Sequence, residues 1–173
     1  MTSPSTLQLR VATKDDAEAI TTLINVAFRG AEDFFIDEDR IDLESVHNLI
    51  RATGEFLLAE EGGRLIGCVS IEPREEGTYL GLLSVDPTIQ QSGIGSRLVT
   101  FAEQRCREQQ SKFIEIYIVN LRVELPNFYK KRGWVETGTL PFPPELQTKI
   151  PCHFITMRKI LEPQASSSAP TDQ

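Results

Sequence analysis

The chain has 173 residues, of which 40% are hydrophobic and 25% are charged, proportions that are typical of a globular protein. This length favours one domain whose core needs no metal or disulfide to stabilise it. The longest apolar runs are far shorter than the ~20 residues of a membrane helix, and the first residues lack the pattern of a signal peptide. Three widely spaced cysteines and two histidines, with no CxxC pair, predict a reducing, cytoplasmic environment and no metal site.

The net charge of −7 argues against a nucleic-acid-binding surface. Its distribution is uneven, because residues 1–89 carry 7 basic and 17 acidic side chains whereas residues 90–132 carry 8 basic and 4 acidic ones. The basic segment could receive a polyanionic ligand, and the acidic segment could attract a cationic one. Both segments could equally be solvated surface.

Hydrophobic periodicity and turn residues predict strands and helices in an irregular order along the chain. The predicted strands cover residues 7–11, 55–60, 64–72, 78–85 and 113–119, and two more follow the last helix. The predicted helices lie at about residues 15–30, 43–51, 94–106 and 127–131. Pro87 ends the strand at 78–85, because proline cannot donate a hydrogen bond to the ladder.

A glycine loop around Gly93 and Gly95 lies between an apolar strand and an amphipathic helix. Such a loop can bind a phosphate through unpaired N–H groups at the helix N-terminus, although it can also be a tight connection without a ligand. The chain has no GxxxxGK[ST] motif, and Leu98 stands where a dinucleotide fingerprint needs glycine or alanine. Both nucleotide-binding motifs are therefore excluded.

The pattern Gln90-x-x-Gly93-x-Gly95, after a strand that ends at Val85, resembles the acyl-CoA-binding motif of the GNAT superfamily of N-acyltransferases. Downstream, Asn120 and the run NFYKKRGW at residues 127–134 are similar to that family's second signature. The resemblance implies an α/β fold whose mixed, mostly antiparallel sheet of about seven strands is flanked by about four helices. It also implies one N-acetyltransferase domain over residues 1–161, whereas the polar segment 162–173 is predicted to be a disordered tail.

The resemblance further implies that acetyl-CoA is the acyl donor and that the glycine loop holds its pyrophosphate. The loop residues concerned are Gln90, Gln91, Ser92, Gly93, Ile94, Gly95 and Ser96. The backbone of Leu83 and Val85 would pair with the pantetheine arm as another strand would. Asn120 and Phe128 would contact the same arm, and Phe128 could equally be an ordinary core residue.

By the same resemblance, Tyr129 is expected to protonate the departing thiolate, because a phenol is protonated at neutral pH. Alternatively, the Tyr129 ring could pack in the core while its hydroxyl contacts water. Attack on a thioester also needs a base that deprotonates the amine, and Glu72 is one candidate. The acidic loop supplies other candidates for the base, which are better placed to bind a cation than to act as a base: Glu32, Asp33, Asp37, Glu38 and Asp39.

Together these features predict an enzyme that transfers the acetyl group of acetyl-CoA directly to an amine, with a cationic small molecule as the acceptor. Phe35, Asp37 and Glu38 would bind this acceptor through cation–π contact and charge, or the acidic loop could be solvated surface whose phenylalanines fill the core. A non-catalytic acyl-CoA sensor, a phosphate-binding module, and a lysine or N-terminal acetyltransferase of proteins or peptides are the alternatives. The proline-rich loop at residues 140–151 could shape the acceptor pocket or a homodimer contact, and no nucleic acid or membrane partner is expected.

Overall fold

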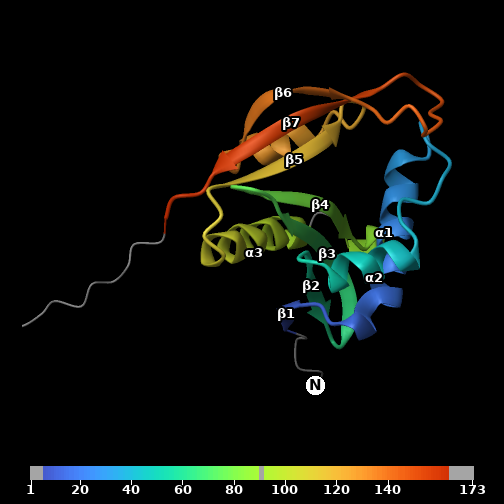
Figure 1. Cartoon of the computed structure of the whole chain (residues 1–173). Helices are drawn as coiled ribbons and strands as arrows, with labels where there is room; N and C mark the ends of the chain where they lie inside the picture. The colour runs from blue at the N-terminus through green and yellow to red at the C-terminus, as the bar shows by residue number, and fades with distance from the viewer. Residues whose placement is uncertain (1–5, 90–91, 164–173) are drawn as a thin grey trace, which may run out of the picture.

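The computed structural model describes residues 6–89 and 92–163, which form one seven-stranded sheet and four α-helices (Figure 1). The strands are β1 (Leu7–Val11), β2 (Glu55–Glu61), β3 (Arg64–Pro73), β4 (Thr78–Val85), β5 (Phe113–Val119), β6 (Val135–Pro141) and β7 (His153–Ile160). The helices are α1 (Ala17–Glu32), α2 (Leu43–Arg51), α3 (Ile94–Glu108) and α4 (Leu125–Lys130). Gln90, Gln91 and most of the predicted tail lie outside the described residues, so the domain boundary at residue 161 stays a prediction.

The strand order in the sheet is β1-β2-β3-β4-β5-β7-β6. Only β4 and β5 run parallel among the described strands, and every other neighbouring pair is antiparallel. This arrangement confirms the α/β fold with a mixed, mostly antiparallel sheet that the sequence predicts.

Two hydrophobic cores lie on opposite faces of the sheet, because successive side chains of a strand point to opposite faces. Leu57 of β2 belongs to the core under α3, together with Leu98 and Ala102. Its neighbours Phe56 and Leu58 belong to the core under α1 and α2. The central strands are thus buried on both faces, and no helix among the described residues is long and apolar enough to cross a membrane.

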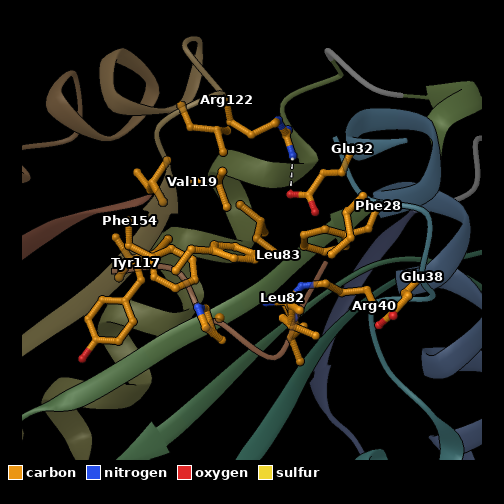
Figure 2. Close-up of a pocket in the computed structure, with 18 of the residues that line it drawn as sticks. Phe28, Glu32, Glu38, Arg40, Leu82, Leu83, Tyr117, Val119, Arg122 and Phe154 are labelled. Atoms are coloured by element: carbon orange, nitrogen blue, oxygen red, sulfur yellow. Dashed lines mark hydrogen bonds and ion pairs between the residues drawn. The ribbon is translucent and has the colours of Figure 1, made fainter. Parts of the chain in front are cut away.

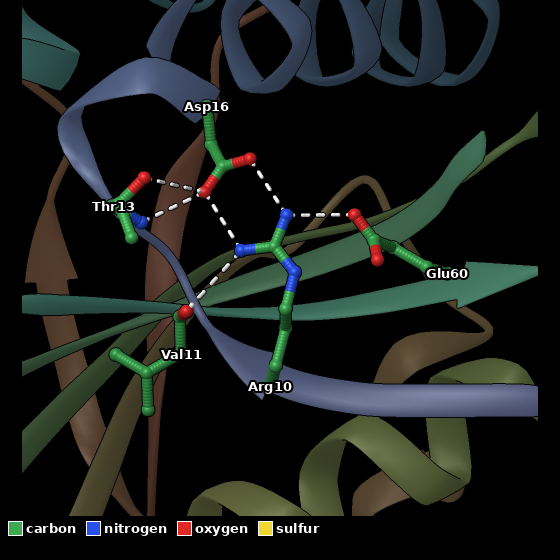
Figure 3. A network of polar contacts seen from close by, with 5 residues as sticks. All are labelled: Arg10, Val11, Thr13, Asp16 and Glu60. Atoms are coloured by element: carbon green, nitrogen blue, oxygen red, sulfur yellow. Dashed lines mark hydrogen bonds and ion pairs between the residues drawn. The ribbon is translucent and has the colours of Figure 1, made fainter. Parts of the chain in front are cut away.

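A polar network fixes the start of α1 to the edge of the sheet (Figure 3). The guanidinium of Arg10, on β1, donates two hydrogen bonds to Asp16, at 2.7 and 2.8 Å, and one to Glu60 on β2 at 2.7 Å. Asp16 also accepts a hydrogen bond from the backbone N–H of Thr13 at 2.7 Å. This network holds the helix whose other end reaches the cleft described next.

Candidate active site

A cleft opens where β4 and β5 separate. The two strands pair only at Thr78–Ile114 and Tyr79–Glu115, and beyond these residues they diverge (Figure 1). The opening leads into a cavity of about 540 Å³ that is also lined by the end of α1, the loop after it, α4 and the loop between β6 and β7. The strand pairing itself therefore creates the cavity.

A β-bulge in β4 forms one wall of this cleft. Ser70 pairs with Gly81 and Cys68 pairs with Ser84, so that Leu82 and Leu83 both stand opposite a single residue of β3. Leu82 has a φ of 55°, a left-handed conformation that is uncommon for leucine. Bulges interrupt the ladder and redirect the backbone, often beside functional sites.

The N-terminus of α3 lies at the end of β4. Gly93 begins the helix with a φ of 82°, which glycine adopts without strain. The first backbone hydrogen bond at this end runs from the N–H of Arg97 to the carbonyl of Gly93 at 3.1 Å. The N–H groups of Ile94, Gly95 and Ser96 therefore have no intrahelical partner and can bind an anion.

Three of the predicted cofactor-binding residues converge beside this helix end. A Cβ atom added to Gly95 would lie 3.8 Å from the Phe128 ring and 3.9 Å from a methyl group of Val85. Arg132, which the sequence analysis did not single out, stacks its guanidinium 3.7 Å from the centre of the Phe128 ring and donates hydrogen bonds to Ser96 and to the Phe128 carbonyl. Only its position inside the second signature could have pointed to it.

Tyr129 lies at the base of the cleft on α4. Its ring packs edge-on against Phe128 and Trp134, with centroid distances of 5.0 and 5.2 Å, and the residue is only 2% exposed. Its hydroxyl forms no hydrogen bond within the described part of the chain but is not sealed from solvent, and the residue lines the cavity. Burial raises the pKa of this phenol, so the hydroxyl keeps its proton at neutral pH.

An ion pair joins the two sides of the cleft. Arg122, in the turn after β5, places Nη1 3.3 Å from Oε1 of Glu32 at the end of α1, and its Nε lies 2.7 Å from Glu124 (Figure 2). Both Glu32 and Arg122 line the cavity. Burial raises the pKa of Glu32, although the charges of Arg122 and Arg40 oppose this shift. No sequence motif points to Arg122.

Some side chains of the acidic loop after α1 are buried in the core, and others line the cleft. Asp37 and Glu38 line the cavity as predicted substrate-binding residues, and Asp37 pairs with Lys149 at 2.7 Å. Phe35 instead is fully buried and does not line the cavity. The structure therefore brings two of the three predicted acceptor-binding residues to the site.

Val85, Phe128 and the described residues of the glycine loop lie outside the cavity lining, and so do Glu72 and Asn120. Glu72 pairs across the strands with Tyr79, which does line the cavity. Asn120 accepts a hydrogen bond from the N–H of His153 at 2.8 Å, which holds the end of β5 against β7. Gln90 and Gln91, two predicted phosphate-binding residues, lie outside the described residues.

Aromatic rings form the wall of the cleft opposite α1. Tyr79 packs against Tyr117 at a centroid distance of 4.9 Å, and Phe154 packs against Phe142 at 5.0 Å. These four residues come from β4, β5, β7 and the loop after β6, and all of them line the cavity. The sequence analysis did not name them, because the alternation of apolar and polar residues along a strand does not indicate which face of the sheet borders a cavity.

Comparison with known proteins agrees with this architecture. The structure is similar to a ribosomal-protein-alanine N-acetyltransferase from Brucella melitensis, with a TM-score of 0.74, 24% identity, and coverage of 89% of this chain and 99% of that one. It is also similar to yncA from Salmonella typhimurium, solved with its cofactor acetyl-CoA, with a TM-score of 0.75, 20% identity, and coverage of 95% and 99%. At these identities the likeness shows the fold.

In sequence, the chain is 28% identical to the protein YdhI of Bacillus subtilis (strain 168) over 86 residues, which are 50% of this chain and 52% of YdhI. The chain spans about half the length of the first curated relatives that it matches. The model of the acetyltransferase (GNAT) family matches residues 17–134, a segment that includes the glycine loop, the β4–β5 cleft and Tyr129. The chain belongs to the acetyltransferase (GNAT) family.

Proposed function

We propose that the protein transfers the acetyl group of acetyl-CoA directly to an amino group of an acceptor molecule. The observation that carries this proposal is the cleft between β4 and β5, which is lined by Leu83 of β4 and by Tyr129, while the N-terminus of α3 follows the end of β4. Membership of the family supports an acetyltransferase activity. The acetyl-CoA bound to a protein of the same fold supports this molecule as the donor.

Acetyl-CoA would enter from the α3 side of the cleft. Its pyrophosphate would accept hydrogen bonds from the backbone N–H groups of the helix terminus, where the helix dipole also favours a negative charge. The pantetheine arm would follow the backbone of Leu83 and Val85 and pack against Phe128, in the manner of a strand added to a sheet. Ser92, Gly93 and Asn120 would help to hold the same arm or its phosphates.

The reaction needs one acid and one base. The amine nitrogen attacks the thioester carbonyl, a C–N bond forms, the C–S bond breaks, and the thiolate leaves. Tyr129 would donate its proton to the sulfur, since its raised pKa keeps the hydroxyl protonated until the thiolate appears. The proton that the amine loses must go to a base, either directly or through a water molecule.

The acceptor would arrive as a cationic small molecule with an ammonium group. Two exposed carboxylates of the cavity lining, those of Asp33 and Glu38, have no ion-pair partner among the described residues. Asp37 and Asp39 are instead neutralised by Lys149 and Arg29. Unpaired carboxylates at the mouth would attract an ammonium group, and the aromatic wall would hold its apolar part.

Turnover with a panel of amines tests this proposal. The wild-type protein is incubated with acetyl-CoA and small amines, amino acids, or peptides with a free N-terminus or lysine, and both released CoA and acetylated product are measured. With at least one small amine, we expect CoA and the acetylated amine to form in equal amounts. Acetyl-CoA binding without product from any acceptor would favour the sensor function. Product from peptides alone would favour the lysine or N-terminal acetyltransferase.

A further inference from the structure

The carboxylates that line the cleft differ strongly in their exposure. Asp33, Asp37, Glu38 and Asp39 are all exposed to solvent, whereas Glu32 is only 8% exposed. Among the described lining residues, Glu32 is therefore the one carboxylate held inside the cleft rather than at its rim. A buried carboxylate is costly unless it is paired or has a function.

Only one oxygen of Glu32 accepts a hydrogen bond from the residues that the structure describes. Oε1 accepts the hydrogen bond from Arg122 at 3.3 Å, a long distance for such a pair. Oε2 accepts no hydrogen bond within the described part of the chain, but it is not fully enclosed. Figure 2 shows this carboxylate directed from α1 into the cleft, between Phe28 and Arg122, with Leu83 close to it. An oxygen in this position can accept a proton from a group inside the cleft.

We infer that Glu32 is the general base that removes the proton from the acceptor amine during acetyl transfer. This inference rests on the proposed function, because a base is needed only if an amine attacks the thioester. The ammonium acceptor first loses one proton to solvent, and Oε2 of Glu32 then takes an N–H proton of the neutral amine, directly or through one water molecule, as the C–N bond forms. Tyr129 gives its proton to the sulfur as the C–S bond breaks. Exchange with solvent then returns one proton to Tyr129 and removes one from Glu32.

The surroundings of Glu32 suit a base at neutral pH. Burial is the largest influence on its pKa and raises it. Arg122 and Arg40 lower the pKa, while Glu124, the second carboxylate beside Arg122, raises it. The net effect is an increase in the pKa of Glu32, which makes this group a better proton acceptor than an exposed glutamate.

Glu72 lacks these features. It lies on β3 beside Tyr79 and is not part of the cavity lining. Tyr79, its partner across the strands, lines the cavity instead. We therefore place the base on α1 rather than on β3.

Glu32 and Glu124 both form ion pairs with Arg122, so substitutions of these two glutamates provide a matched pair of variants. Glu32→Gln removes the proposed base, and Glu124→Gln removes the exposed carboxylate that pairs with Arg122 at 2.7 Å but does not line the cavity. We expect Glu32→Gln to lower kcat by ~10²-fold or more, in the range of general base catalysis. Glu124→Gln should leave kcat within about twofold of the wild type, and both variants should keep the wild-type Kd for acetyl-CoA.

The pH dependence of kcat/KM distinguishes a general base from a residue that only forms an ion pair with Arg122. The wild-type kcat/KM should fall at low pH as Glu32 is protonated, and Arg122→Gln should move this limb to higher pH because it removes a cation that lowers the pKa. In Glu32→Gln that limb should be absent, and the rate should instead rise with pH up to the pKa of the acceptor amine. A Glu32→Gln enzyme with the wild-type rate and pH profile would overturn the inference. An acidic limb that stays at the wild-type pH in Arg122→Gln would also overturn the inference.

The wild-type measurement distinguishes the failure of this inference from that of the proposed function. If the wild-type protein acetylates no amine in the panel, the proposed function fails before any variant is made. If the wild type is active and Glu32→Gln is equally active, only the assignment of the base fails. Thermal unfolding of each variant shows whether a loss of rate comes from a loss of folded protein.

Discussion

The ammonium group of Lys149 lies 2.7 Å from the carboxylate of Asp37, and it also donates a hydrogen bond to the Asp33 carbonyl at 2.9 Å. In addition, the N–H of Lys149 donates to the carbonyl of Phe35 at 2.8 Å. The loop between β6 and β7 is thus attached to the acidic loop after α1. These contacts close one side of the cleft and neutralise part of the acidic charge at its mouth.

Glu38 should therefore contribute more to the capture of a cationic acceptor than its paired neighbours do. We expect Glu38→Gln to raise KM for an ammonium acceptor several-fold while kcat changes little, because the side chain attracts substrate but takes no part in the chemistry. The loss should shrink as ionic strength rises, since salt screens exposed charges. Steady-state kinetics at low and high salt measure both effects. Glu75→Gln, in the turn between β3 and β4, is the control, and equal effects of the two variants would contradict the prediction.

Tyr129→Phe should separate acid catalysis from packing. The phenylalanine ring keeps the contacts with Phe128 and Trp134, so stability and the Kd for acetyl-CoA should stay close to those of the wild type. Without the hydroxyl proton, kcat should fall by ~10²-fold or more. Stopped or continuous assays of CoA release, together with calorimetric binding, test this expectation. Wild-type turnover in the variant would leave Tyr129 as a packing residue.

Gly95→Asp should weaken the binding of acetyl-CoA without unfolding the helix. The new Cβ would make only ordinary contacts, at 3.8 Å from Phe128, and an acidic residue in the first turn stabilises a helix. The carboxylate would however repel the pyrophosphate, so we expect Kd to rise at least ~10-fold by Coulomb repulsion at close range. Gly95→Ala is the uncharged control and should bind nearly as the wild type does. An unchanged Kd in Gly95→Asp would remove the phosphate site from α3.

The Arg10 network should make stability depend on pH (Figure 3). Hydrogen bonds from Arg10 lower the pKa of Asp16 in the folded state, so their contribution is present above the unfolded pKa of about 3.9 and is lost as pH falls through the lower folded value. Arg10→Gln should lower Tm at pH 7 by about 2–4 °C, corresponding to ~1 kcal/mol for a partly exposed pair. The difference from the wild type should shrink below about pH 4. Thermal scans across pH test this, with the exposed Arg51→Gln as control.

Local sequence patterns predicted the elements of this fold well. The apolar spacing along α3 and the alternation of Ile114, Ile116 and Ile118 along β5 match the observed buried faces. Glycine at position 93 and the apolar strand before it also predicted the N-terminus of α3. These features are readable because helix and strand periodicities depend on residues only a few positions apart.

The tertiary structure alone decided which loop residues meet in the cleft. Glu32 and Arg122 are 90 residues apart, and no pattern around either of them predicts that the end of α1 meets the turn after β5. The acidic loop contains Phe35 and Glu38 only three residues apart, yet one side chain is fully buried and the other lines the cavity. Sequence determined the types of element and the anion-binding turn, because these depend on local backbone geometry. The composition of the site depends on how distant loops pack against each other, which is why only the folded chain identifies Glu32, rather than Glu72, as the carboxylate inside the cleft.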